Sequence, residues 1–294
     1  MLWLLIILLA MAGNAGAQAS TTAVPPDVER TTQRSTQPTP KLLSAALPSP
    51  SEDRAAESIL LQLANESREQ VGAPPLRMDK SLSEAAHEHA RLMVESEQLT
   101  HQFEGEPALL QRIAEVSPMR LDRAGENVAY NSNTERTHEA LMLSPPHRQN
   151  LLDPTFNVAG IAAIWSADRL YVVEDFAREV PARSPQQAAK LVAQSVGSVR
   201  QQAGLPQLAQ LSYPQLNYAV CELAVESNVK ARALGGLQGK RGTVTYTQSR
   251  PEVLPQGAMK LLQRRDVRHF AVGTCYARSA QSPAGVYWVA IVLN

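Results

Sequence analysis

Apolar side chains return every three or four residues in four stretches of the first half of the chain, the spacing of one face of an α-helix. The first stretch starts near Ser51, and Gly72 followed by two prolines closes it. The other three are Leu82 to Met93, starting near Asp79, then Leu109 to Ile113, and Glu135 to Met142, which stops at Pro145-Pro146. The pattern therefore predicts four helices.

Short runs rich in β-branched and aromatic residues lie outside these helices and indicate strands. They cover residues 127–130, 158–165 and 170–177, and the last two flank a turn at Ala167-Asp168 that is typical of an antiparallel hairpin. Helices that come first and paired strands that come last favour an α+β layered fold over a parallel sheet with alternating helices.

The second half of the chain repeats the outline of the first, which predicts a degenerate internal duplication. A proline-rich break at 181–185 separates the halves, and Ser184, Pro185 and Gln187 give a helix start of the capping-box type. The matching pairs are Arg68, Gly72 and Leu76 with Arg200, Gly204 and Leu208, then 82–90 with 216–224, and Gly160 with Gly273. The predicted domains are 51–180 and the smaller 186–294.

The N-terminus indicates export. An apolar run from Leu2 to Ala12 precedes small-x-small patterns at 15–17 and 17–19, so residues 1–17 are expected to be a signal peptide. No Lys or Arg precedes the run, and a retained anchor is the alternative. Residues 18–50 are rich in Ser, Thr and Pro and are expected to be a disordered linker. The expected location is secreted or periplasmic, in the cell envelope.

Charge and aromatic content argue against nucleic acid as a partner. The 28 Lys and Arg balance the 28 Asp and Glu, whereas nucleic-acid binding needs a basic surface. Aromatic residues make up only 5%, which leaves little for base stacking. No second apolar run has membrane-spanning length, so no integral span is expected after signal cleavage.

The chain has two cysteines, Cys221 and Cys275. In an oxidising compartment they can form one disulfide, and two buried thiols are the alternative. The duplication places Cys221 on a helix and Cys275 at the start of a strand, so helix and strand would have to pack face to face for the sulfurs to meet.

Four short motifs follow one another in the first half. They are Leu99-Thr100-His101, Gly125-Glu126-Asn127, the segment 144–152 (SPPHRQNLL) and the segment 171–176 (YVVEDF). Each alone is weak, but in this order they closely resemble bacterial members of the CAP superfamily (SCP-like domains), relatives of cysteine-rich secretory, antigen 5 and pathogenesis-related proteins. The resemblance spans about residues 55 to 178.

This resemblance implies a three-layer α-β-α sandwich with an antiparallel central sheet, followed here by a smaller degenerate repeat. It also implies a cleft with two histidines and two acids. The histidines map to His101 and His147 and the first acid to Glu126, whereas residues 141–144 offer no second acid. The second half carries no counterpart of these three residues, so a packing or interaction role is expected there.

Two imidazoles and one carboxylate form a plausible ligand set for zinc or another divalent metal. Neither an HExxH helix nor a GxSxG elbow is present, so binding of a metal or small ligand is favoured and catalysis stays open. One alternative is a metal-dependent hydrolase acting on envelope peptides or glycans. Another is a structural or adhesion module in which these residues only stabilise loops. The partner would be an unidentified small ligand or envelope component.

Simpler roles exist for each candidate. His101 could cap a helix C-terminus, Glu126 and Asn127 could pin their loop through hydrogen bonds to the backbone, and His147 could start a helix. Among the other histidines, His89 is expected in the core, and His87 and His138 are expected to be solvated. His269 lies among Arg264, Arg265 and Arg268, a cluster that favours an exposed loop over the alternative of an anion site.

Overall fold

The computed structural model describes residues 49–225 and 241–294. Contacts divide the chain into two units, residues 1–46 and 47–294, and the following concerns the second unit. The predicted signal peptide and nearly all of the predicted linker lie outside the described residues. No helix among the described residues is long and apolar enough to cross a membrane.

A five-stranded sheet is the centre of the first lobe, which we define as this sheet with helices α1 to α5. Its strands are β1 (Ser51–Glu52), β2 (Arg77–Met78), β3 (Leu121–Asn131), β4 (Val158–Ser166) and β5 (Arg169–Glu179). The order β1-β4-β5-β3 is antiparallel, and β2 adds to β4 in parallel. The long strand β3 therefore stands at the end of this path, beside β5.

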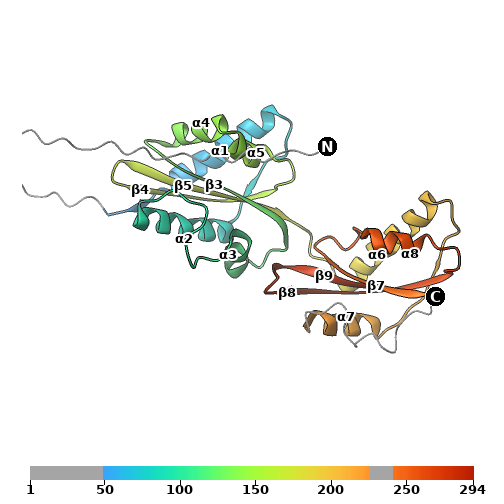
Figure 1. The fold of residues 1–294 in the computed structure, drawn as a ribbon. Helices are drawn as coiled ribbons and strands as arrows, with labels where there is room; N and C mark the ends of the chain where they lie inside the picture. Colours follow the sequence, from blue (N-terminus) through green and yellow to red (C-terminus); the bar gives the residue numbers. More distant parts are fainter. Residues whose placement is uncertain (1–48, 226–240) are drawn as a thin grey trace, which may run out of the picture. The chain divides into compact units, whose positions relative to one another are not determined.

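Helices cover both faces of this sheet (Figure 1). They are α1 (Arg54–Gln70), α4 (Thr134–Leu143) and α5 (Pro145–Leu152) on one face, and α2 (Lys80–Ser96) and α3 (Leu109–Val116) on the other. Because strand side chains alternate, β4 and β5 supply apolar residues to both helical layers. Ile161 and Val172 pack with α1, whereas Ala162 and Val173 pack with α2. The result is the three-layer α-β-α sandwich that the resemblance implies.

The second lobe has a four-stranded sheet with helices α6 to α8. Its strands are β6 (Ala209–Gln210), β7 (Gly242–Gln248), β8 (His269–Ser279) and β9 (Ser282–Leu293), and its helices are α6 (Pro185–Gln202), α7 (Leu216–Val225) and α8 (Gln256–Leu262). The order β6-β8-β9-β7, with β6 parallel to β8, matches β2-β4-β5-β3 of the first lobe. Helices α6 and α8 cover one face and α7 the other (Figure 1).

Matched contacts accompany this matched strand order. Arg68 and Arg200 are both fully buried, and the Nε of each donates to a proline carbonyl six residues later, at 2.7 and 2.9 Å. The start of α2 packs so closely on β4 that a Cβ on Gly160 would lie 2.1 Å from the Leu82 backbone, and Gly273 meets Leu216 of α7 in the same way. These parallels favour the predicted duplication, whose origin stays a prediction.

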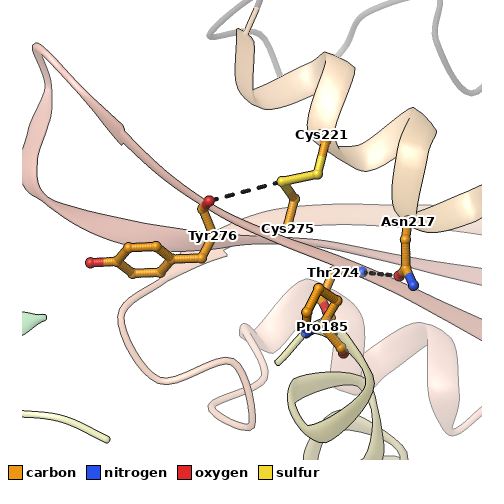
Figure 2. The surroundings of a disulfide bond; sticks show 6 residues. All are labelled: Pro185, Asn217, Cys221, Thr274, Cys275 and Tyr276. Atoms are coloured by element: carbon orange, nitrogen blue, oxygen red, sulfur yellow. Dashed lines mark hydrogen bonds between the residues drawn. A yellow bond between two sulfur atoms is a disulfide. The ribbon is translucent and has the colours of Figure 1, made fainter. Parts of the chain in front are cut away.

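The two cysteines form a disulfide, which confirms the predicted pairing (Figure 2). Cys221 lies on α7 and Cys275 on β8, with their Cα atoms 5.1 Å apart, so helix and strand pack face to face as expected. The side chain of Asn217, one turn earlier on α7, accepts a hydrogen bond from the Thr274 amide at 2.9 Å. Helix α7 is thus held to the sheet at two successive turns.

Some elements differ from the sequence predictions. Pro145 and Pro146 end α4, as expected, but they also begin α5, because the first turn of a helix leaves its N–H groups unused and tolerates proline. Strand β3 begins at Leu121 instead of residue 127. The strand β7 and the helix α8 were not predicted.

Candidate functional site

Three different elements of the first lobe position the three predicted site residues. His101 lies in the loop after α2, Glu126 lies in the middle of β3, and His147 lies in the first turn of α5. The elements α2 and α5 cover opposite faces of the sheet, so the two histidines approach β3 from opposite layers (Figure 1). The structure brings all three residues together at the β3 side of the sheet.

The distances define how the three side chains interact. The Nδ1 atom of His101 lies 2.8 Å from Oε1 of Glu126, and the ring centroids of His101 and His147 are 6.3 Å apart. A carboxylate only accepts, so this hydrogen bond assigns the proton of neutral His101 to Nδ1 and leaves Nε2 as the acceptor nitrogen. The Glu126 side chain is 4% exposed and that of His101 is 57% exposed, so solvent reaches the histidine and not the acid.

Both oxygens of Glu126 have partners. Oε1 accepts from His101, and Oε2 accepts from Nη2 of the buried Arg112 on α3. A carboxylate engaged at both oxygens orients a histidine more readily than it binds a metal directly. Among the described residues, no group of three or more His, Cys, Asp or Glu side chains is arranged to hold a metal ion. The cluster therefore offers two imidazoles with a carboxylate behind one of them.

A buried ion network continues behind Glu126. Nη1 of Arg112 donates to Glu106 at 2.9 Å, and Nδ1 of His89 lies 2.7 Å from the same Glu106 oxygen. The other nitrogen of His89 faces the Thr100 carbonyl at 2.8 Å. Both ring nitrogens of His89 therefore have oxygen partners, which fix the orientation of the imidazole inside the lobe. Glu106 and Arg112 were missed by the sequence analysis, because no motif or spacing links them to Glu126.

Two neighbouring acids of β5 lie beneath the cluster, on opposite faces of the sheet. Asp175 pairs with Glu126 in register, and Glu174 pairs with Asn127. Burial, and then the nearby Glu126 carboxylate, raise the pKa of Asp175 well above its ordinary value. Burial also raises the pKa of Glu174 to about 7, although Asn127 donates to it at 3.2 Å. Neither acid matches the missing motif position, yet both are completely buried.

Two asparagines fix His147 against β3. Asn127 donates from Nδ2 to the His147 carbonyl at 3.1 Å, and Asn150 of α5 donates to the carbonyl of Glu126 at 3.0 Å. The sequence analysis considered a pinning role for Asn127, and the structure shows it. Burial, and then the charge of His101, lower the pKa of His147, so its imidazole is neutral at pH 7.

Two further histidines correct the sequence analysis, which expected them to be solvated. His87 is 2% exposed, and its Nε2 lies 2.8 Å from the carboxylate of Glu57 in the first turn of α1. His138 is 8% exposed and its Nε2 lies 2.9 Å from Oγ of Ser67. Burial lowers the pKa of His138. His89 is buried, as expected, and its two nitrogens face the Glu106 carboxylate and the Thr100 carbonyl instead of apolar groups.

Comparisons with known proteins agree on the first lobe. Residues 61–176 match the family described as CAP, the cysteine-rich secretory protein family. A curated relative, the uncharacterised protein YkwD of Bacillus subtilis strain 168, is 32% identical over 120 residues. That match covers 40% of this chain and 46% of the relative, so the chain spans about half the length of this relative.

The solved structures to which this chain is similar include two bacterial proteins. An extracellular protein containing an SCP domain from Bacillus anthracis strain Ames is 25% identical, with a TM-score of 0.38, and the match covers 42% of this chain and 41% of that one. An outer surface protein from Borrelia burgdorferi is 21% identical, with a TM-score of 0.41, over 44% of this chain and 98% of that one.

Proposed function

Because residues 61–176 belong to the cysteine-rich secretory protein (CAP) family, we propose that this chain is an exported binding protein. Its ligand is a divalent metal ion of the zinc type, held by His101 and His147 at the β3 side of the first sheet. Glu126 acts on the metal only through His101, by fixing the tautomer and the direction of that imidazole.

The single observation that carries this proposal is the geometry of the two imidazoles. Their centroids are 6.3 Å apart, about 1 Å more than a tetrahedral ion with metal–nitrogen bonds of about 2.0 Å requires, so the exposed ring of His101 has to move toward His147 when the ion binds. His101 presents Nε2 as its acceptor nitrogen, because its Nδ1–H donates to the Glu126 carboxylate. His147 is neutral at pH 7. Neutral imidazole is the form that binds zinc. Bound zinc would supply Lewis acidity at this point of the surface.

Binding is better supported than hydrolysis. A hydrolase of this kind needs a base that can take a proton from water. Glu126 is the acid nearest the histidines, but its oxygens already accept from His101 and Arg112 and its side chain is 4% exposed. A carboxylate held in that way is suited to orienting the imidazole of His101.

Zinc titration by calorimetry tests the proposal on the mature chain. Wild-type protein should bind one equivalent, and the His101→Ala/His147→Ala variant should show no saturable binding. Glu126→Gln should weaken binding about 10- to 100-fold, the usual effect of losing a carboxylate behind a metal-binding histidine. Melting curves of all variants establish that they are folded.

His269→Ala is the matched control, because His269 is an exposed histidine of the second lobe. Its zinc affinity should equal that of the wild type. Unchanged zinc binding in the double histidine variant would overturn the proposal.

A further inference from the structure

The second lobe contains a cavity of about 430 Å³ whose described lining is cationic. Arg200, Arg265 and Arg268 line it together with Gln207, and none of its described lining residues is acidic. Its volume lies within the range of small-molecule sites. A hollow lined by three arginines and by no acidic residue is suited to an anionic ligand.

Arg200 differs from its first-lobe counterpart in one hydrogen bond. In the first lobe, Nη2 of Arg68 donates to the carbonyl of Phe156 at 3.0 Å. In the second lobe, Nε and Nη1 of Arg200 donate to Pro206, Leu262 and Arg264 carbonyls, but Nη2 donates to none of the residues that the structure describes. The side chain of Arg200 is almost fully buried and lines the cavity, so Nη2 is the donor left to face it.

The charges around the two buried arginines also differ. Beside Arg68 lies Asp153, whose carboxylate favours the charged guanidinium. Burial lowers the pKa of both arginines, and beside Arg200 a second cation, Arg268, lowers it further. The nearby carboxylate of Asp266 is already paired with Arg264 at 2.6 Å and Arg241 at 3.2 Å. Positive charge in the cavity is therefore not compensated by the described side chains that line it.

Two exposed arginines complete the cavity at its rim. Arg268 is held by its Nη1 atom, which donates to the Arg265 and Val267 carbonyls, so its guanidinium has a fixed position. The guanidinium of Arg265 makes no hydrogen bond or ion pair with any described residue. Planar, forked donors of this kind match the oxygens of a phosphate group.

We propose that the second lobe binds a phosphate group in this cavity, with Arg200 Nη2 at the floor and Arg265 and Arg268 at the rim. The phosphate belongs either to a soluble phosphorylated molecule or to a phospholipid headgroup. The cluster of arginines near His269 is then the anion site that the sequence left as the alternative to a plain exposed loop.

Titration of the mature chain with inorganic phosphate, followed by amide chemical shifts, tests this site. Saturable shifts are expected at Gly204, Leu205 and Val267, which line the cavity. Arg265→Gln should weaken binding about fivefold, the upper range for one exposed ion pair. Arg265→Gln/Arg268→Gln should abolish saturation.

Lys260→Gln is the matched control, because it removes one positive charge from an exposed residue of the same lobe that does not line the cavity. Its phosphate affinity should stay within twofold of wild type, and so should that of His101→Ala/His147→Ala, whatever happens to zinc. No saturable shift in the wild type, or equal weakening by Lys260→Gln and Arg265→Gln, would overturn the proposal.

Vesicles separate the two sources of phosphate. Sedimentation with phosphatidylglycerol vesicles that is lost in the double arginine variant, with no sedimentation on phosphatidylcholine, identifies a lipid headgroup. Binding of free phosphate without sedimentation identifies a soluble ligand. Either result supports the site, whereas vesicle binding that is equal in wild type and double variant contradicts the lipid source.

Discussion

Because side chains along β5 point alternately to the two faces of the sheet, its two adjacent acids have different surroundings. Asp175 shares a sheet face with Glu126 and so lies behind the histidine cluster, whereas Glu174 lies on the face covered by α1, α4 and α5. Glu174 accepts one hydrogen bond from Asn127 at Oε2, and its Oε1 finds no donor among the described residues. A carboxylic acid tolerates such a place better than a carboxylate does, because burial without donors penalises the charged form.

Glu174 therefore makes stability depend on pH. Its folded pKa of about 7 exceeds the ordinary 4.5, so the folded state holds the extra proton between these values. The stabilisation is complete below the unfolded pKa and is lost as pH rises through the folded one. Between pH 5 and pH 8 the wild type should lose about 2.5 kcal/mol more unfolding free energy than Glu174→Gln. Urea unfolding at the two pH values measures this.

The control for this pH dependence is a variant that removes an exposed acid. Glu139→Gln on α4 serves, because Glu139 is exposed, and its pH dependence should follow the wild type. If Glu174→Gln and wild type lose the same free energy between the two pH values, Glu174 is ionised in the folded protein.

At the scale of elements, the periodic apolar pattern predicted α1 to α4 and the β4–β5 hairpin to within a few residues. It failed where local signals conflict with packing. The proline pair before His147 indicates the end of a helix, yet it also begins α5. The first residues of β3 include Asp122 and Arg123, which interrupt the apolar alternation that would have indicated a strand. The motifs named His101, Glu126 and His147, but Arg112 and Glu106 come from a helix and a loop that only tertiary packing brings to Glu126.

The approach of α2 to β4 depends on the absence of a side chain at Gly160. A Cβ there would lie 2.1 Å from the carbonyl carbon of Leu82 and 2.3 Å from the amide of Ser83, which are backbone atoms that cannot turn away. Gly160→Ala should therefore force α2 from the sheet and cost about 3 kcal/mol or more of unfolding free energy. Chemical denaturation measures the loss.

Gly257 in α8 gives the opposite case, since a Cβ there meets nothing within 4 Å and the residue is helical. Gly257→Ala should stabilise by about 0.5–1 kcal/mol through helix propensity. A Gly160→Ala protein as stable as wild type would mean that α2 and β4 do not pack this closely.

At the scale of the molecule, the two lobes share a plan and differ in what their sheets bury. Asp175 of β5 pairs in register with Gly160 of β4 and Glu126 of β3. In the second lobe, Ala290 of β9 has the corresponding position and pairs with Gly273 of β8 and Thr245 of β7. The first lobe therefore keeps buried ionisable groups where the second has small or β-branched residues. Buried ionisable groups that cost stability are typical of a functional site, as proposed for the first lobe, whereas a disulfide ties the sheet of the second lobe to α7.

Removing the disulfide should destabilise the second lobe. Its cysteines are 54 residues apart, and a closed loop of that length contributes about 4 kcal/mol in the chain-entropy model. Cys221→Ala/Cys275→Ala should lower the urea midpoint accordingly, and reduction of the wild type should lower it by a similar amount. An unchanged midpoint in both would show that the disulfide adds nothing to folding.

The same disulfide reports on export, because it forms in oxidising compartments and is rare in the cytosol. Made in bacteria with residues 1–17 present, the chain should lose that segment and carry no thiol that reacts with a maleimide after unfolding. A version that starts at Gln18 should stay in the cytoplasm and label at Cys221 and Cys275. An uncut chain with two reactive thiols would overturn export. It would show that residues 1–17 are not removed as a signal peptide and that the cysteines have not reached an oxidising compartment.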